Sequence, residues 1–427
     1  MNTLAAVTSC LSDYDPNALP LAHAKRILAD FITPVEESET LTLRAALGRV
    51  LADAVISAID VPAHDNSAMD GVALRGDDLP DVAGKSYRVV GAAFAGKPFA
   101  GAVGIGECVR IMTGAVMPRD CDTIVPQEFA RIENDRALLP AGVKRGQHRR
   151  FAGEDLKAGA AAIEAGRVLT PSDLGLAASL GIPTLNVKRR ARVAFFSTGD
   201  ELASIGEPLA EGSVYDSNRY TIYGMLTRLG VEAIDLGVVR DDPAALEAAL
   251  RRACEDPKIR ADAIVTSGGV SVGEADYTKE IMQRLGDVAF WKIAMKPGRP
   301  MAFGRVSSNG CSAILFGLPG NPVAVMVTFY ALVRDALLRL SGARYCELPT
   351  LTAICDTPLK KNPGRTEYQR GIAWRATDGW HVRVTGAQGS GILRSMSEAN
   401  CLIVLPHERA SVAVGELVEA LPFEGIV

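Results

Sequence analysis

The sequence predicts a multidomain α/β protein, in which a doubly wound α/β domain is accompanied by a β-rich lid domain, a helical linker domain and a C-terminal β-barrel. Its 427 residues exceed what a single hydrophobic core usually organises. Between residues 192 and 340, short apolar runs alternate with amphipathic segments, which is typical of parallel strands covered by helices. On both sides of this region, turn residues separate short runs of alternating apolar residues, as in β domains.

The first half of the chain is expected to hold two domains, one inserted into the other. Residues 20–51 are predicted to be helical, because apolar side chains recur there at helical spacing. Residues 80–150 have the short alternating segments of a small β domain, and residues 160–187 return to a helix and a strand. We therefore predict a linker domain over residues 1–60 and 150–188, with the lid domain inserted at residues 61–149.

The second half is expected to hold the α/β domain over residues 189–342 and the barrel over residues 347–427. Strands are predicted at residues 193–197, 231–239, 263–265 and 311–318. Helices are predicted at residues 217–230, 243–254, 276–285 and 322–340. Gly230 suits the end of the first helix and Pro243 the start of the second. Short strands separated by turn residues, the last at residues 416–421, indicate a C-terminal β-barrel or sandwich, of which we predict the barrel.

Three of the predicted strands end in glycine and small polar residues, in the segments 197–201, 267–274 and 318–322. In a doubly wound domain these strand ends share one edge of the sheet, where ligands bind. Glycines let the backbone approach a ligand closely, and a following helix offers free N–H groups to an anion. We therefore predict a phosphate-binding crevice that includes Ser267, Gly268, Gly269, Ser271, Gly273, Pro319, Gly320, Asn321 and Pro322.

Carboxylates gather near these segments, at Asp200, Glu201, Asp241, Asp242, Glu274 and Asp276. Each alone has a structural explanation; Asp242, for example, precedes Pro243 and suits a helix N-cap. Together, beside an anion site, they favour a divalent metal, and oxygen ligands without His or Cys pairs favour Mg²⁺ over zinc. The expected Mg²⁺ ligands are Glu201, Asp242, Glu274 and Asp276.

Two basic segments are candidates for holding an oxyanion. Lys292, Lys296 and Arg299 surround a predicted turn, which is either an oxyanion site or a solvated basic loop. Residues 144–150 form a second basic run, followed at once by Gly153-Glu-Asp155, which suggests the rim of a site. The pattern offers no Ser–His–Asp or Cys–His constellation, so metal-assisted attack on a phosphate is expected rather than a nucleophilic side chain.

Composition narrows the class of protein further. The net charge of −4 gives no support to nucleic-acid binding. The eight cysteines form no C-x-x-C pair, which indicates reduced thiols in a cytoplasmic protein. Residues 1–20 lack the apolar core of a signal peptide. The longest uncharged run, residues 306–333, is interrupted by two prolines and is too short to cross a bilayer, so no membrane association is expected.

Eight segments, taken together and in order, resemble the molybdopterin molybdenumtransferases, the MoeA family, which is also related to the gephyrin E domain. They are Asp65-Asn-Ser-Ala-Met-Asp-Gly71, Arg110-Ile-Met-Thr-Gly-Ala115, Gly153-Glu-Asp155, Ser197-Thr-Gly-Asp-Glu-Leu202, residues 267–279, Lys296-Pro-Gly-Arg-Pro300, Gly317-Leu-Pro-Gly-Asn-Pro322 and Gly389-Ser-Gly-Ile-Leu-Arg-Ser-Met396. The resemblance runs from about residue 20 to the end of the chain. Val72 departs from it, where the family often has an aromatic residue.

The resemblance implies a reaction in which molybdate and adenylated molybdopterin give molybdenum cofactor and AMP, with Mg²⁺. It implies a MogA-like α/β domain and an elongated homodimer, with each active site between the α/β domain of one subunit and the lid of the other. It also implies partners, namely molybdopterin adenylyltransferase and molybdoenzyme maturation proteins. Carried onto this sequence, the active-site acids and polar groups are Asp65, Thr113, Asp155, Glu201, Asp242 and Asp276. The anion-binding positions are Lys292, Lys296, Arg365 and Ser390.

Two other functions remain open from the sequence. The first is an adenylyltransferase acting on molybdopterin, which would consume ATP without molybdate. The second is a non-catalytic scaffold, since relatives of the gephyrin type also organise partners. The sequence does not choose between molybdate and tungstate, and it does not fix which acids bind the metal directly.

Overall fold

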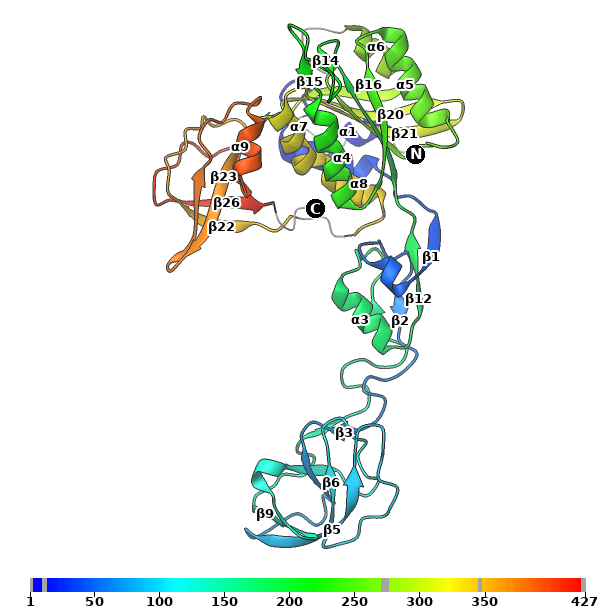
Figure 1. Ribbon diagram of the computed structural model, residues 1–427, viewed down its shortest axis with the longest axis vertical. Helices are drawn as coiled ribbons and strands as arrows, with labels where there is room; N and C mark the ends of the chain where they lie inside the picture. The colour runs from blue at the N-terminus through cyan, green and yellow to red at the C-terminus, as the bar shows by residue number, and fades with distance from the viewer. Residues whose placement is uncertain (1–2, 10–13, 270–275, 345–347, 424–427) are drawn as a thin grey trace.

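The computed structural model is elongated, with the α/β domain and the C-terminal barrel at one end, a small linker domain in the middle and the lid domain at the other end (Figure 1). It describes residues 3–9, 14–269, 276–344 and 348–423. Within this part of the chain, no helix is long and apolar enough to cross a membrane. The predicted fold class, a multidomain α/β protein with a lid and a C-terminal barrel, is confirmed.

A six-stranded sheet forms the centre of the α/β domain, in the order β16-β13-β17-β21-β20-β18. Its strands are β13 (Arg192–Thr198), β16 (Glu232–Val239), β17 (Ala263–Ser267), β18 (Gly286–Lys292), β20 (Pro300–Ser308) and β21 (Cys311–Leu318). The first four in this order run parallel, and β20 and β18 complete the sheet in antiparallel pairs. The chain leaves β13 to β16 on one side and later returns to β17 on the other. The edge between β13 and β17 is therefore the switch point at which ligands bind in such sheets.

Helices cover both faces of this sheet and bury two separate apolar layers. One layer joins α2 (Leu21–Phe31), α4 (Ser217–Leu229) and the helical run α7 (Pro322–Thr328), η3 (Phe329–Val333) and α8 (Arg334–Leu340). The other joins α5 (Pro243–Glu255) and α6 (Asp276–Leu285). The termini of α4 follow from the sequence, since Asp216 caps its start and Gly230 ends it with a φ of 80°. Shorter elements that accompany this sheet are α1 (Leu4–Thr8), β14 (Leu202–Ala203) and β15 (Val214–Tyr215).

The linker domain is built from antiparallel strand pairs around one small core, and the lid holds a mostly antiparallel sheet with one parallel strand pair and two small cores. In the linker, β1 (Ser38–Thr42) pairs with β12 (Thr184–Lys188) and β2 (Val55–Ile56) with β11 (Ala161–Ile163), beside η1 (Leu43–Ala46) and α3 (Pro171–Ser179). The lid sheet has the order β7-β4-β6-β5-β9-β8. Its strands are β4 (Gly71–Leu74), β5 (Lys85–Ala93), β6 (Glu107–Ile111), β7 (Thr123–Pro126), β8 (Arg131–Glu133) and β9 (Arg136–Leu139), with η2 (Gln127–Phe129) after β7. A short pair, β3 (Asn66–Ser67) and β10 (Arg149–Arg150), lies at the end that faces the linker.

The C-terminal domain is a closed five-stranded barrel. Its strands are β22 (Leu351–Cys355), β23 (Thr366–Ala376), β24 (Gly379–Val384), β25 (Cys401–Leu405) and β26 (Leu417–Pro422), and α9 (Leu393–Glu398) precedes β25. The ring closes because β23 pairs with both β24 and β25. A short strand of the α/β domain, β19 (Met295–Lys296), pairs with β23 in parallel and joins the two domains.

Two expectations about local structure need correction. The helix expected over residues 20–51 ends at Phe31, and the chain continues as β1 and η1. Pro34 explains the stop, because a proline disfavours helical conformation at the residue before it and cannot donate in a helix interior. The basic segment 291–299 was expected only as a turn. Lys292 is instead the last residue of β18, which forms an antiparallel pair with β20. Their pairing depends on the rest of the sheet rather than on local pattern.

Candidate functional site

A candidate site lies at the carboxyl ends of β13, β17 and β21, at the switch point of the sheet. A cavity of about 630 Å³ opens there. Its lining combines the three strand-end segments with a turn that contains Lys296 and with residues 388–390 of the barrel. Of the residues predicted for the crevice, Ser267, Gly268, Gly269, Pro319, Gly320 and Asn321 line the cavity, and Pro322 begins α7 beside it. Ser271 and Gly273 lie outside the described residues.

Gly268 shows why this loop requires glycine. Its φ is +92°, in the region that favours glycine, and an added Cβ would lie 2.5 Å from the carbonyl oxygen of Thr198. The Gly268 N–H donates to the carbonyl of Leu318 at 3.1 Å. The loop after β17 is therefore held against both neighbouring strand ends, and its backbone lies open to the cavity.

Asn218, near the start of α4, holds the ends of β17 and β21 in place through two hydrogen bonds. Its amide nitrogen donates to the Ser267 hydroxyl at 2.7 Å and to the Gly320 carbonyl at 2.6 Å. The side chain is buried and also lines the cavity. Asn218 was not predicted as a site residue, because its two partners come from distant segments of the chain. Gln388 of the barrel was missed for the same reason.

The predicted carboxylates are placed unequally around the cavity. Glu201 lines it, together with Asp241, which had only been considered as part of the cluster. Asp242 does not line it; its carboxylate accepts from the Ala245 N–H at 2.8 Å and caps α5. Asp276 begins α6, with its side chain outside the described part, and Glu274 lies wholly outside it. Within the described part of the chain, no group of three or more His, Cys, Asp or Glu is arranged to hold a metal.

The predicted anion-binding groups lie on two neighbouring cavities. Lys296 and Ser390 line the large one. Lys292, Arg299 and Arg365 line a second cavity of about 300 Å³, between the α/β domain and the barrel. Four cations thus surround the segment that links β18 to β20, which makes the place suited to an oxyanion.

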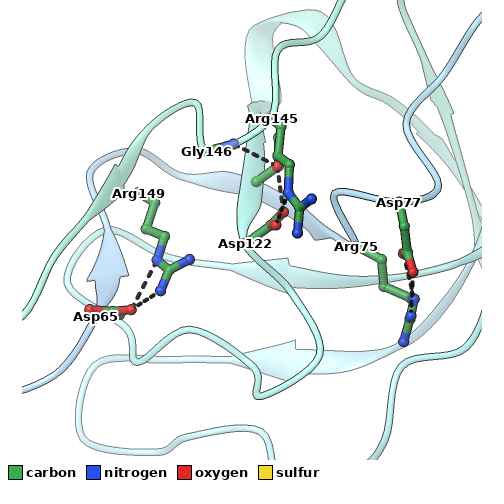
Figure 2. Close-up of polar contacts among 8 residues, drawn as sticks. Asp65, Arg75, Asp77, Asp122, Arg145, Gly146 and Arg149 are labelled. Atoms are coloured by element: carbon green, nitrogen blue, oxygen red, sulfur yellow. Dashed lines mark hydrogen bonds and ion pairs between the residues drawn. The ribbon is translucent and has the colours of Figure 1, made fainter.

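The predicted residue Asp65 belongs to a separate group of polar contacts in the lid. Its carboxylate accepts from the Arg149 guanidinium, at 2.9 Å from Nε (Figure 2). It also accepts from the Ala152 N–H at 2.8 Å. Burial alone would raise the pKa of Asp65, but these hydrogen bonds outweigh it and hold the pKa below its usual value. Two further ion pairs of the lid join Arg145 with Asp122 and Arg75 with Asp77.

Thr113 is exposed on the lid, and Asp155 is exposed just beyond the lid, where its N–H donates to the Val61 carbonyl at 3.0 Å. The hydroxyl and the N–H of Thr113 both donate to Asp70 at 2.7 Å, and these bonds lower the pKa of Asp70. Asp70 was not predicted as a site residue, although it belongs to the same sequence segment as Asp65. Its role here is to fix Thr113.

A single chain does not bring Asp65, Thr113 and Asp155 to the crevice. The lid lies at the opposite end of the molecule from the α/β domain, with the linker domain between them (Figure 1). The candidate residues therefore form two sets. One set is the crevice with its acids and cations. The other set is Asp65 and Thr113 on the lid, with Asp155 at the junction between the lid and the linker.

Comparison with family models identifies the class of protein to which this fold and site belong, as molybdopterin-binding proteins of the MoeA type. Residues 19–181 match the family model described as the MoeA N-terminal region (domain I and II). Residues 194–339 match a probable molybdopterin binding domain, and residues 352–423 match the MoeA C-terminal region (domain IV).

Individual relatives agree along the whole chain. The molybdopterin molybdenumtransferase of Haemophilus influenzae is 41% identical, over 96% of this chain and 100% of its own length. That of a Nostoc species is 34% identical, over 91% and 89%. The crystal structure of a molybdopterin biosynthesis moeA protein from Pyrococcus horikoshii superimposes with a TM-score of 0.81 at 28% identity, over 95% of this chain and all of that one. The chain therefore belongs to the MoeA family, as its motifs indicated.

Proposed function

We propose that this protein is a molybdopterin molybdenumtransferase, which inserts molybdate into adenylated molybdopterin with release of AMP and so takes part in molybdenum cofactor biosynthesis. One observation carries the proposal: backbone loops suited to phosphate line one cavity together with Lys296 and Ser390, and three further cations, Lys292, Arg299 and Arg365, line the neighbouring cavity. The two substrates are both anionic, so a site that unites them needs such compensation. The names of the relatives support the same activity.

In this proposal the residues of the crevice divide the work. The loop around Gly268 and Gly269 and the residues 319–322 bind the phosphates through backbone groups. Lys292, Lys296, Arg365 and Ser390 bind the oxyanion. Attack at phosphorus comes from water or from a molybdate oxygen, since the crevice presents no activated nucleophilic side chain among its described lining residues.

Magnesium is the proposed metal, because the acids near the cavity offer only oxygen donors, which suit Mg²⁺. Glu201 lines the cavity, and Asp276 begins the helix that follows the glycine loop. These two acids, with Asp242 and Glu274, would hold the ion, and the ion would polarise the phosphoanhydride. Asp241 is a further candidate from its place on the cavity wall.

A homodimer is proposed with each site shared between subunits. The separation of Asp65, Thr113 and Asp155 from the crevice supports this arrangement, because a partner's lid could supply what the same chain does not (Figure 1). The domain division proposed from the sequence, with residues 61–149 as the lid and residues 189–342 as the α/β domain, accords with this arrangement. We further propose a cytoplasmic location, with a molybdopterin adenylyltransferase and molybdoenzyme maturation proteins as partners and without nucleic acid.

The decisive experiment is AMP release from adenylated molybdopterin, with and without molybdate and Mg²⁺. Release that requires both is the expected result. Equal release without molybdate would make the protein a hydrolase, and ATP consumption would make it an adenylyltransferase. Absence of release under every condition would favour a scaffold.

A further inference from the structure

The buried side chain of Glu367 contacts two of the proposed anion-binding cations, one from the lining of each cavity. Its Oε1 accepts from Arg365 Nε at 2.9 Å, and its Oε2 lies 3.7 Å from Lys296 Nζ. Only 2% of the Glu367 side chain is exposed, whereas 53% of Lys296 and 43% of Arg365 are exposed. The carboxylate is thus enclosed, and the two cations present their other sides to solvent.

Strand pairing between two domains creates this arrangement. Lys296 belongs to β19 of the α/β domain and Glu367 to β23 of the barrel, and they are register partners in a parallel pair. The Thr366 N–H donates to the Ala294 carbonyl at 2.9 Å and fixes that register. Arg365 stands two residues before Glu367, a spacing that places both side chains on the same face of an extended chain.

The charges around Glu367 are unequal. Lys296 and Arg365 carry two positive charges against one carboxylate, and Lys292 and Arg299 stand on the wall of the adjoining cavity. A buried carboxylate is stable only when it is paired and hydrogen-bonded, which these cations provide. An oxyanion that enters between Lys296 and Arg365 would approach the same two cations from their exposed sides.

We propose that Glu367 is a positioning residue that serves as an internal counter-anion: it holds Lys296 and Arg365 together across the domain boundary and competes with the oxyanion that binds them. The inference rests on the proposed function for the identity of the oxyanion, molybdate, but not for the existence of the site. By this competition the Glu367 carboxylate weakens oxyanion binding. By its ion pairs it keeps the two cations in place while the site is empty.

The test is calorimetric titration of the full-length protein with molybdate, and with sulfate as a second tetrahedral dianion. Glu367→Gln keeps the size of the side chain and an oxygen that can accept from Arg365, but removes the charge. A unit charge roughly 6 Å from a dianion in a water-like dielectric changes its affinity by about tenfold, so Glu367→Gln should bind molybdate about tenfold more tightly. Glu367→Asp keeps the negative charge but moves it away from the cations, because its side chain is shorter. Its affinity for molybdate should lie between those of the unaltered protein and Glu367→Gln.

Glu398→Gln is the matched control, because Glu398 pairs with Arg394 at 2.7 Å elsewhere in the barrel. It should bind molybdate as the unaltered protein does. Unchanged or weaker binding by folded Glu367→Gln would overturn the inference, as would absence of binding by both proteins. If Glu367→Gln does not fold, weaker binding by Glu367→Asp than by the unaltered protein would overturn it.

The AMP-release assay separates this inference from the proposed function. Tighter oxyanion binding by Glu367→Gln in a protein that releases no AMP would support the counter-anion and contradict the transferase. AMP release, together with unchanged molybdate affinity in Glu367→Gln, would support the transferase and contradict the counter-anion. In an active protein, Glu367→Gln should lower KM for molybdate, a change that simple loss of stability would not produce.

Discussion

At the scale of single residues, the structure pairs many of the charges that the sequence presents as free. Asp65 is bound by Arg149, Asp242 caps a helix, and Glu367 holds two cations. Pairing of this kind changes what a substitution reports, because a lost carboxylate also releases its partner. Variants that keep the hydrogen bond while removing the charge are therefore the informative ones.

Lys292 and Lys296 provide the first residue-scale prediction. Lys292→Ala or Lys296→Ala should weaken molybdate binding by about tenfold, since each removes one charge close to a dianion. Nucleotide binding should change less, because the loop around Gly268 supplies backbone groups. Calorimetry with molybdate and with AMP measures the two effects. Lys25→Ala, an exposed lysine on α2, is the control, and equal molybdate affinity in all of these proteins would contradict the prediction.

His381 in the barrel provides a prediction about pH. Hydrogen bonds to Asp356 and then Asp378, both at 2.9 Å, raise the pKa of His381. A raised folded-state pKa means that the protonated pair stabilises the fold below the unfolded pKa and loses this effect as pH rises through the folded pKa. His381→Asn should therefore lower Tm more at about pH 5.5 than at about pH 9. Thermal melts at both values measure this, and an equal Tm loss at both would refute it.

At the scale of secondary-structure elements, loop geometry and helix capping place the crevice. The loop after β17 fits under Thr198 because Gly268 has no side chain, and Asn218 at the start of α4 ties two strand ends together. The start of α5 depends on Asp242, a residue also proposed as a metal ligand. These elements support the fold, and in the proposed function they would also contact the ligand.

Asp242 allows the two roles at the start of α5 to be separated. Asn caps a helix about as well as Asp, whereas Ala costs about 1 kcal/mol. Asp242→Asn should thus keep the free energy of unfolding, and its rate of AMP release should fall on the order of 10²-fold if the charge holds the metal. Asp242→Ala should lose both. A fully active Asp242→Asn would leave Asp242 only as a cap.

Gly268 gives a steric prediction for the loop after β17. Gly268→Ala should destabilise the protein by about 1–3 kcal/mol, because it combines a positive φ with contact against Thr198. Gly310→Ala is the control, since Gly310 has a φ of +78° but nothing within 4 Å of an added Cβ. Denaturant unfolding of both variants, with AMP titration, should show the larger loss for Gly268→Ala. Equal losses would mean that backbone strain alone accounts for the effect.

At the scale of the whole molecule, the elongated shape separates two sets of candidate residues. The lid and the α/β domain lie at opposite ends, joined through the linker domain (Figure 1). A symmetric dimer can bring the lid of one chain to the crevice of the other, so that each chain contributes to two sites. Dimers formed from two differently substituted chains therefore test this arrangement.

Asp65→Ala and Asp276→Ala subunits should complement each other when they are mixed. In a mixed dimer one site has two intact halves and the other has both substitutions. Random mixing at equal concentration should restore about a quarter of the activity of the unaltered protein. Mixed dimers as inactive as either parent would show that the sites are not shared.

The sequence by itself determined the features that depend on neighbouring residues. Apolar periodicity located most helices and strands of the α/β domain, and Asp216 and Gly230 mark the ends of α4 because capping is a local interaction. The motifs were specific enough to indicate the family. The three strand-end loops also indicated the crevice, since parallel strands place their ends on one edge.

Tertiary structure alone decided what joins residues far apart in the chain. The strands β18 and β20 form because the sheet offers them an edge, and Asn218 acquires its role from partners on two other strands. Glu367 is indistinguishable from a surface acid until β19 and β23 pair and enclose it. Local pattern encodes periodicity and termini, whereas burial and the pairing of distant charges arise only when elements pack together.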